Sequence, residues 1–155
     1  MAYWLMKSEP DVFGIDDLAK SPGKTTCWDG VRNYQARNFM RDGMRRGDLA
    51  FFYHSNTDEP GIAGIVKIVK EGYPDHTAFD VNDAHYDPDS DPKKPRWYMV
   101  DVKLERKFRR TITLATLREH ETSALKGLAL LKRGNRLSVL PVSDAHWKFI
   151  LDLAK

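Results

Sequence analysis

Two aromatic side chains stand where the chain turns, and their types suit the binding of a flat ring. Trp28 ends a short strand-like segment, Thr25–Trp28, and precedes an Asp-Gly turn, so its indole can face the mouth of a cavity. Stacking a base on such a face contributes about 1–3 kcal/mol. Tyr86, in a long polar loop, can form the second wall of a cage. The alternatives are a core tryptophan, because large aromatic rings dominate cores, and a loop tyrosine packed on the body of the protein.

Polar side chains that follow apolar segments supply hydrogen-bonding groups beside these rings. Lys7, Ser8 and Glu9 come directly after the apolar segment Tyr3–Met6, and His54 ends a later one. A serine hydroxyl donates and accepts, whereas an ionised glutamate only accepts and therefore suits an exocyclic amine or a ring N–H. The alternatives are an ordinary solvated turn for the first three residues and a neutral imidazole bonded to the backbone for His54.

Phosphate groups would be held by cations near the same segments. Lys7 could contact a phosphate as a point charge, and Arg32 flanks the start of a helix, where a phosphate could also bind. Asn33 begins a helix, where it caps the first turn and can also bind a ligand. The basic runs Arg106–Arg110 and Lys132–Arg136 can follow a phosphate backbone. Their alternative role is a solvated charged edge that protects a strand from aggregation.

Catalytic and metal-binding patterns are missing from the sequence. The five histidines are scattered, and none stands at metal-ligand spacing from another or from Cys27. We therefore expect no metal, no cofactor and no catalytic residue. Two rivals to a binding module stay open: an enzyme acting on RNA or nucleotides, and a sensor whose pocket takes a free nucleoside or an anionic metabolite.

Composition limits the class of protein. The 155 residues are 41% hydrophobic and suit one compact domain, residues 1–155. The net charge of +3 permits a polyanionic partner without requiring one. No segment approaches the roughly 20 apolar residues that span a bilayer. A single cysteine excludes an internal disulfide and indicates a reducing compartment, so we expect a cytosolic monomer without membrane contacts.

Hydrophobic periodicity predicts five or six strands and four or five short helices. Because strands and long helices do not alternate, a doubly wound sheet is disfavoured and an α+β arrangement is expected. The expected strands are Tyr3–Met6, Thr25–Trp28, Asp48–His54, Ile62–Lys70, Trp97–Phe108 and Leu137–Val142. The expected helices are Ile15–Ala19, Asn33–Met40, Leu114–His120, Ser123–Leu131 and a C-terminal helix capped by Ser143 and running through Leu153. A polar, proline-rich loop is expected over Asp75–Pro95.

An ordered set of short strings carries a resemblance to a known family. The main strings are Tyr3–Pro10, Trp28–Asn38, Phe52–Ser55, Gly61–Gly64, Tyr86–Pro88, Pro95–Trp97 and Arg136–Val142. Together they resemble EVE domains, a branch of the PUA-like superfamily related to the YTH domains that read methylated adenine in RNA. The resemblance implies a PUA-like twisted mixed β-barrel of five to six strands with flanking short helices. It also implies recognition of modified bases in DNA or RNA.

The resemblance sharpens the expected complex. Trp28 occupies the place of a cage tryptophan in YTH domains, so we expect it and Tyr86 to sandwich one extruded, modified base. Ser8, Glu9, Asn33 and His54 would lie along the base edge, with the phosphates on Lys7, Arg32 and Arg136. YTH domains tend to carry an amide or a tyrosine-like residue near the Glu9 position. A carboxylate there makes cytosine or guanine derivatives more plausible ligands than methylated adenine.

Overall fold

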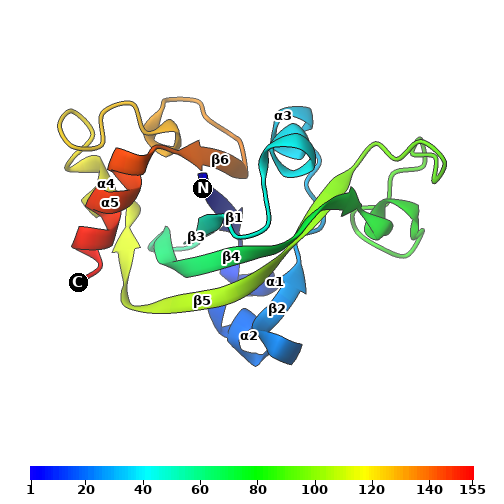
Figure 1. Cartoon of the computed structure of the whole chain (residues 1–155), viewed down its shortest axis with the longest axis horizontal. Helices are drawn as coiled ribbons and strands as arrows, with labels where there is room; N and C mark the ends of the chain where they lie inside the picture. The colour runs from blue at the N-terminus through cyan, green and yellow to red at the C-terminus, as the bar shows by residue number, and fades with distance from the viewer.

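Six strands form one mixed sheet at the centre of the molecule (Figure 1). The computed structural model covers residues 1–155. Across the sheet the strands follow the order β2-β5-β4-β3-β1-β6; only β1 and β3 run parallel, and the other neighbours are antiparallel. The bounds are β1 (Tyr3–Ser8), β2 (Thr25–Cys27), β3 (Leu49–His54), β4 (Gly61–Pro74), β5 (Tyr98–Thr113) and β6 (Val139–Val142). All six expected strands are therefore confirmed, with β1, β4 and β5 longer than expected and β6 shorter.

The α+β class is confirmed, but the sheet is open rather than a closed barrel. Its end strands are short: β2 has three residues and pairs with β5, while β6 has four and pairs with β1. Pro141 lies in β6, and proline is confined to edge strands because it lacks an N–H for the ladder. Four register shifts between β4 and β5 bend this long pair, since bulges increase local twist. The curvature is thus present without closure.

Short helices lie on both faces and at the ends of the sheet. Their bounds are α1 (Pro10–Phe13), α2 (Ile15–Lys20), α3 (Tyr34–Asn38), α4 (Leu114–Arg118) and α5 (Asp144–Leu153). Asn33 and Ser143 cap α3 and α5 as expected, accepting bonds from the amides of Ala36 and His146. The long loop between β4 and β5 projects from the end of the sheet opposite to α4 and α5 (Figure 1).

The helix expected over Ser123–Leu131 is wrong. Successive turns fill this segment, and only the 3-10 turn η4 (Ala129–Leu131) follows them. Gly127 has φ of 87°, a left-handed conformation that interrupts a right-handed helix. The expected helix Asn33–Met40 is also shorter, because α3 passes into a π turn, η2 (Phe39–Gly43). Leu125 and Leu128 are buried nonetheless. The apolar spacing therefore predicted correctly that these residues are buried, but not the secondary structure that buries them.

Alternation along the strands divides the core between two faces of the sheet. One face, called the α3 face, buries Met6 and Phe52 in a cluster with Ala36 of α3. The other, called the α5 face, buries Leu5 and Phe51 in a cluster that also contains side chains of α4, α5 and the turns before β6. Adjacent residues of β1 and β3 therefore serve opposite faces.

Asp48 joins the start of β1 to the turn before β3. Its carboxylate is buried and accepts hydrogen bonds from the Ala2 amide at 3.1 Å, the Trp4 indole N–H at 3.1 Å and the Arg45 amide at 2.9 Å. A buried carboxylate with three donors is satisfied, and the donors in turn depend on it. This contact helps to hold β1 in its parallel register with β3.

Replacing Asp48 with asparagine should destabilise the fold, because the new amide group turns a donor toward existing donors. We expect the free energy of unfolding to fall by about 2 kcal/mol, measured by urea denaturation. The control is Asp152→Asn, since that carboxylate is exposed and contacts only Lys155, at 3.3 Å. Equal losses for the two variants would contradict a structural role for Asp48.

Candidate nucleic-acid interface

A basic loop between η4 and β6 is the centre of the candidate interface. It carries Lys132, Arg133 and Arg136, and none of these side chains forms an ion pair or a hydrogen bond within the protein. Asn135 holds the loop in shape, because its side chain donates to the Ala129 carbonyl at 2.7 Å and accepts from the Leu137 amide at 2.8 Å. The cations are therefore presented from an ordered loop and are free for an external anion.

One hollow, called the α3 hollow, lies between this loop and the start of α3. Its volume is about 370 Å³ and its lining combines residues 132–137 with Asn33 and Gln35. The Asn33 side-chain oxygen accepts a hydrogen bond from the Ala36 amide at 3.0 Å, and the Asn33 side-chain N–H groups stay free. The Gln35 side chain has no hydrogen-bond partner within the protein. Cations and free amides without any carboxylate suit a phosphate and the polar edge of a base.

A second hollow, called the Lys7 hollow, borders the same loop. Its volume is about 460 Å³, and residues 132–135 line it together with Lys7, Tyr53, Leu114, Arg118, Glu121, Leu130 and Leu131. The structure thus brings Asn33 and Arg136 together in one hollow and places Lys7 in the neighbouring one. Lys132 and Arg133, from the basic run expected to follow a phosphate backbone, join them, and so does Arg118, which the sequence had not assigned to the site.

Ser8, Glu9 and His54 lie together at the ends of β1 and β3, where Ser8 is the register partner of His54. The three side chains already have partners. The Ser8 hydroxyl donates to the Phe13 carbonyl at 2.6 Å, Glu9 accepts from the Asn56 amide group at 3.0 Å, and His54 Nε2 accepts from the Ile15 amide at 3.1 Å. The bonds of Ser8 and His54 anchor α1 and α2 to the sheet, so ligand binding by Ser8 or His54 requires exchange of these bonds.

Trp28 is buried, with 7% of its surface exposed. Its ring lies edge-on to Phe52 at 5.4 Å between centroids, and His54 lies edge-on to the same Phe52 ring at 5.5 Å. The Trp28 amide donates to the Val100 carbonyl, which extends the pairing of β2 with β5. Trp28 lines neither the α3 hollow nor the Lys7 hollow. Its role as a stacking wall stays a prediction, one that requires the ring to be uncovered.

Arg32 ties the segment after β2 to the long loop. Its guanidinium donates to Asp75 at 3.1 Å and to the His85 carbonyl at 2.6 Å, and it lies over the Trp97 ring at 5.3 Å. Tyr86 follows His85 in the chain and is 40% exposed. The phosphate role of Arg32 and the cage role of Tyr86 stay predictions. For Arg32, a phosphate would compete with these internal acceptors.

Asp75 is the fully buried carboxylate at this junction. Burial alone would raise the pKa of Asp75, but hydrogen bonds from Thr77, the Gly30 amide and Arg32 outweigh it, and the pKa lies below its ordinary value. The Thr77 amide donates at 2.9 Å and the Gly30 amide at 2.8 Å. Asp75 therefore stays ionised and fixes the turn that follows Trp28.

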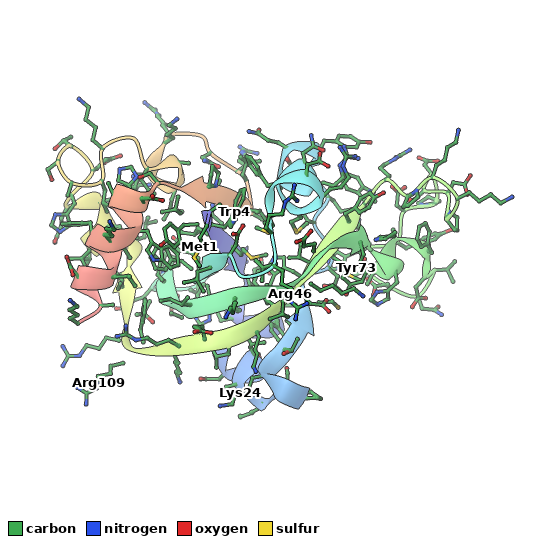
Figure 2. All side chains as sticks on the ribbon, viewed as in Figure 1. Met1, Trp4, Lys24, Arg46, Tyr73 and Arg109 are labelled. Carbon is green, nitrogen blue, oxygen red and sulfur yellow. The ribbon has the colours of Figure 1, made fainter.

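The basic run on β5 lies outside both hollows. Arg106 lies over the Phe108 ring and Lys107 pairs with Asp16, while Arg109 extends from β5 away from the body of the molecule (Figure 2). Because β2 pairs only with residues 101–103, the later part of β5 is covered by β4 on one side alone. This placement matches the alternative role of the run as a charged, protected edge.

Two features are absent from the structure. No group of three or more His, Cys, Asp or Glu side chains lies close enough together to hold a metal ion. None of the helices combines the length and the apolar character that crossing a membrane requires.

The chain belongs to the EVE family: the EVE domain model matches residues 2–153. It is 54% identical to thymocyte nuclear protein 1 of Danio rerio over 97% of this chain and 71% of that protein. It is 50% identical to the Homo sapiens protein of that name over 98% and 73%. The resemblance inferred from the short sequence strings is thereby confirmed.

Solved structures show the same fold. One is the crystal structure of human THYN1 protein in complex with DNA containing 5-methylcytosine, with 49% identity, a TM-score of 0.96 and coverage of 100% of this chain and 98% of that one. Another is a Pseudomonas putida protein, with 45% identity, a TM-score of 0.94 and coverage of 99% and 100%.

The expected cytosolic location is contradicted, because the relatives above are named nuclear proteins. The expectation rested on a single cysteine, which indicates a reducing compartment. The cytosol and the nucleus are both reducing, so cysteine usage could not separate them.

His54 should make the stability of the fold depend on pH. Burial lowers the pKa of His54 below its ordinary value; Asp16 opposes this shift and Lys107 adds to it. In the unfolded chain the histidine has its ordinary pKa of about 6.5, so near that pH the unfolded chain binds more protons than the folded one. The contribution of neutral His54 is complete above that pH and is lost as the pH falls toward the folded pKa.

Thermal unfolding measured from pH 8 to pH 5 tests this, with His54→Gln as the comparison. Glutamine keeps an acceptor for the Ile15 amide but does not titrate, so the variant should lose less stability in acid than the wild type. The other histidines contribute equally to both proteins. Identical acid losses would show that the bond from Ile15 does not depend on neutral His54.

Proposed function

We propose that residues 1–155 form one non-catalytic module that binds nucleic acid carrying a modified base, with 5-methylcytosine in DNA as the best-supported ligand. The observation that carries the proposal is the likeness to the human THYN1 protein crystallised with such DNA, at a TM-score of 0.96 over the whole chain. The two chains are 49% identical. The Glu9 carboxylate is compatible with a cytosine derivative, because an ionised carboxylate can accept from the exocyclic amine of cytosine once its bond from Asn56 is exchanged.

The charge distribution supports a polyanionic partner. The whole chain has a net charge of only +3, yet the two hollows together gather five cations against one carboxylate. The three cations of the basic loop have no internal partner, so an external phosphate does not have to break an ion pair to reach them. Phosphate contacts of this kind position a nucleic acid without reading its sequence.

The base itself is proposed to enter beside Trp28. Two placements support this site: Phe52 links the Trp28 and His54 rings, and His85 packs on Gly30, two residues after Trp28. Gly30 has φ of 77°, and a Cβ there would stand 2.5 Å from the His85 ring, so only glycine allows this approach. Tyr86 follows His85 in the chain, which supports its proposed place at the second wall of the site. Entry of a base must uncover the Trp28 ring and exchange the internal bonds of Ser8 and His54.

Fluorescence anisotropy with matched oligonucleotides tests the function. We expect duplex DNA with one 5-methylcytosine to bind more tightly than the unmodified duplex, with no change in the oligonucleotide after long incubation. Equal affinity for the two duplexes would contradict base recognition. A modified product would establish an enzyme instead. Tighter binding of the matching RNA, or binding of the free nucleoside without salt dependence, would redirect the proposal to RNA or to a small-molecule sensor.

Trp28→Phe should reduce the preference for the methylated duplex, because a smaller ring stacks less well while apolar volume is largely kept. Complete loss of a stacked base contact costs about 1–3 kcal/mol, so we expect a smaller but measurable part of this. Trp147→Phe is the control, since Trp147 is buried on the α5 face against Phe51. The ratio of the two dissociation constants is the readout. An unchanged ratio for Trp28→Phe would place the base elsewhere.

Arg136→Gln should weaken binding to methylated and unmethylated DNA alike. Loss of one phosphate contact reduces the slope of log affinity against log salt by about 1. The control is Lys148→Gln, because Lys148 is an exposed cation on α5 that lines neither hollow. A slope for Arg136→Gln equal to that of Lys148→Gln would remove Arg136 from the interface.

A further inference from the structure

We propose that the Lys7 hollow is a second binding site, specific for a phosphate group and separate from the base site beside Trp28. The phosphate can belong to a nucleic-acid backbone or to a free nucleotide, since both present the same anionic oxygens. The inference stands on the contacts around Lys7 and does not require the base-binding proposal.

The Lys7 ammonium is half-buried and has no anionic partner. The ammonium forms no hydrogen bond and no ion pair within the protein. It makes one cation–π contact, with the Tyr53 ring, at 5.9 Å from the nitrogen to the ring centroid. Partial burial removes some of the water around the ammonium, which costs free energy unless an anion compensates. Burial accordingly lowers the pKa of Lys7. A cation held in this way is stabilised by any anion that enters the hollow.

Three more cations surround the same space. Arg118, Lys132 and Arg133 line the hollow, against the single carboxylate of Glu121. Glu121 accepts from Arg118 at 3.4 Å through one nitrogen, which leaves further guanidinium N–H groups of Arg118 for a ligand. The excess of positive charge is therefore local and only partly neutralised, as a site for an anionic phosphate group requires.

The floor of the hollow strengthens this attraction. Tyr53, Leu114, Leu130 and Leu131 supply apolar surface to the lining beside the cations. Charges attract more strongly beside apolar walls than in open water, because the local dielectric is lower. The volume of about 460 Å³ admits a phosphate together with part of the sugar or base attached to it.

Strand alternation separates this site from Trp28. Lys7 follows Leu5 on the α5 face, where Tyr53 also lies, whereas Ser8 and His54 point toward the α3 face with Phe52. The two sites therefore lie on opposite faces of β1 and β3. A ligand of the Lys7 hollow does not have to displace the partners of Ser8 or uncover Trp28.

The test is a titration of the full chain with inorganic phosphate at constant ionic strength, followed by amide NMR shifts. We expect saturable shifts at Lys7 and in residues 130–135, and about tenfold weaker binding in Lys7→Met, because a hydrogen bond to a charged group is lost. Arg133→Gln, on the exposed loop, provides a second variant that leaves the sheet untouched. Lys148→Met is the matched control and should bind like the wild type.

The source of the phosphate is separated by a second arm with methylated duplex DNA. If the backbone supplies the phosphate, Lys7→Met weakens DNA binding and DNA competes with inorganic phosphate. If a free nucleotide supplies it, Lys7→Met loses phosphate binding while DNA affinity stays the same. Non-saturable shifts, or shifts that survive in both Lys7→Met and Arg133→Gln, would overturn the site. Phosphate binding without any DNA binding would instead reject the proposed function and leave this site standing.

Discussion

The parallel pairing of β1 with β3 is the contact on which both candidate sites depend. It sets Lys7 opposite Tyr53 and Ser8 opposite His54. Because side chains alternate along a strand, one step along this pair moves from the α5 face to the α3 face. A register shift by one residue would turn the Lys7 ammonium toward the core around Phe52 and remove the cation from its hollow. The buried Asp48 carboxylate, which binds the start of β1 to the turn before β3, therefore supports function as well as stability.

The basic loop and the region around Trp28 differ in whether a ligand can bind without a structural change. The cations of the basic loop have no internal partners and face open hollows. Trp28 is 7% exposed, and the polar groups near it are bonded to the backbone of the α1–α2 segment. In the proposed function, phosphate contacts thus form on an existing surface, whereas base recognition requires local opening. The free energy required for that opening makes the binding free energy of any base less favourable and lowers its apparent affinity.

Much of the fold followed from periodicity and caps, because those signals are local. The six strands, the Asn33 cap and the Ser143 cap were predictable from neighbouring residues. The segment Ser123–Leu131 was mistaken for a helix, since buried leucines occur at similar spacing in compact turns. Closure of the sheet could not be judged, because it depends on whether β2 and β6 meet. Arg118 was missed as a site residue for a related reason: nothing in the sequence brings it near Lys7.

Arg32 illustrates two roles that the sequence cannot tell apart, phosphate binding and internal hydrogen bonding. An arginine before a helix cap is a reasonable phosphate ligand, and its guanidinium does bind oxygen atoms here. Those oxygens belong to Asp75, Thr77 and the His85 carbonyl. The effect is to hold the long loop, with Tyr86, against the turn after Trp28. A substitution at Arg32 would therefore alter base binding through the placement of Tyr86, and a loss of affinity there would not by itself identify a phosphate contact. The unpaired cations beside the two hollows, by contrast, hold no other part of the protein in place. A loss of affinity on their substitution therefore reports a direct contact with the ligand.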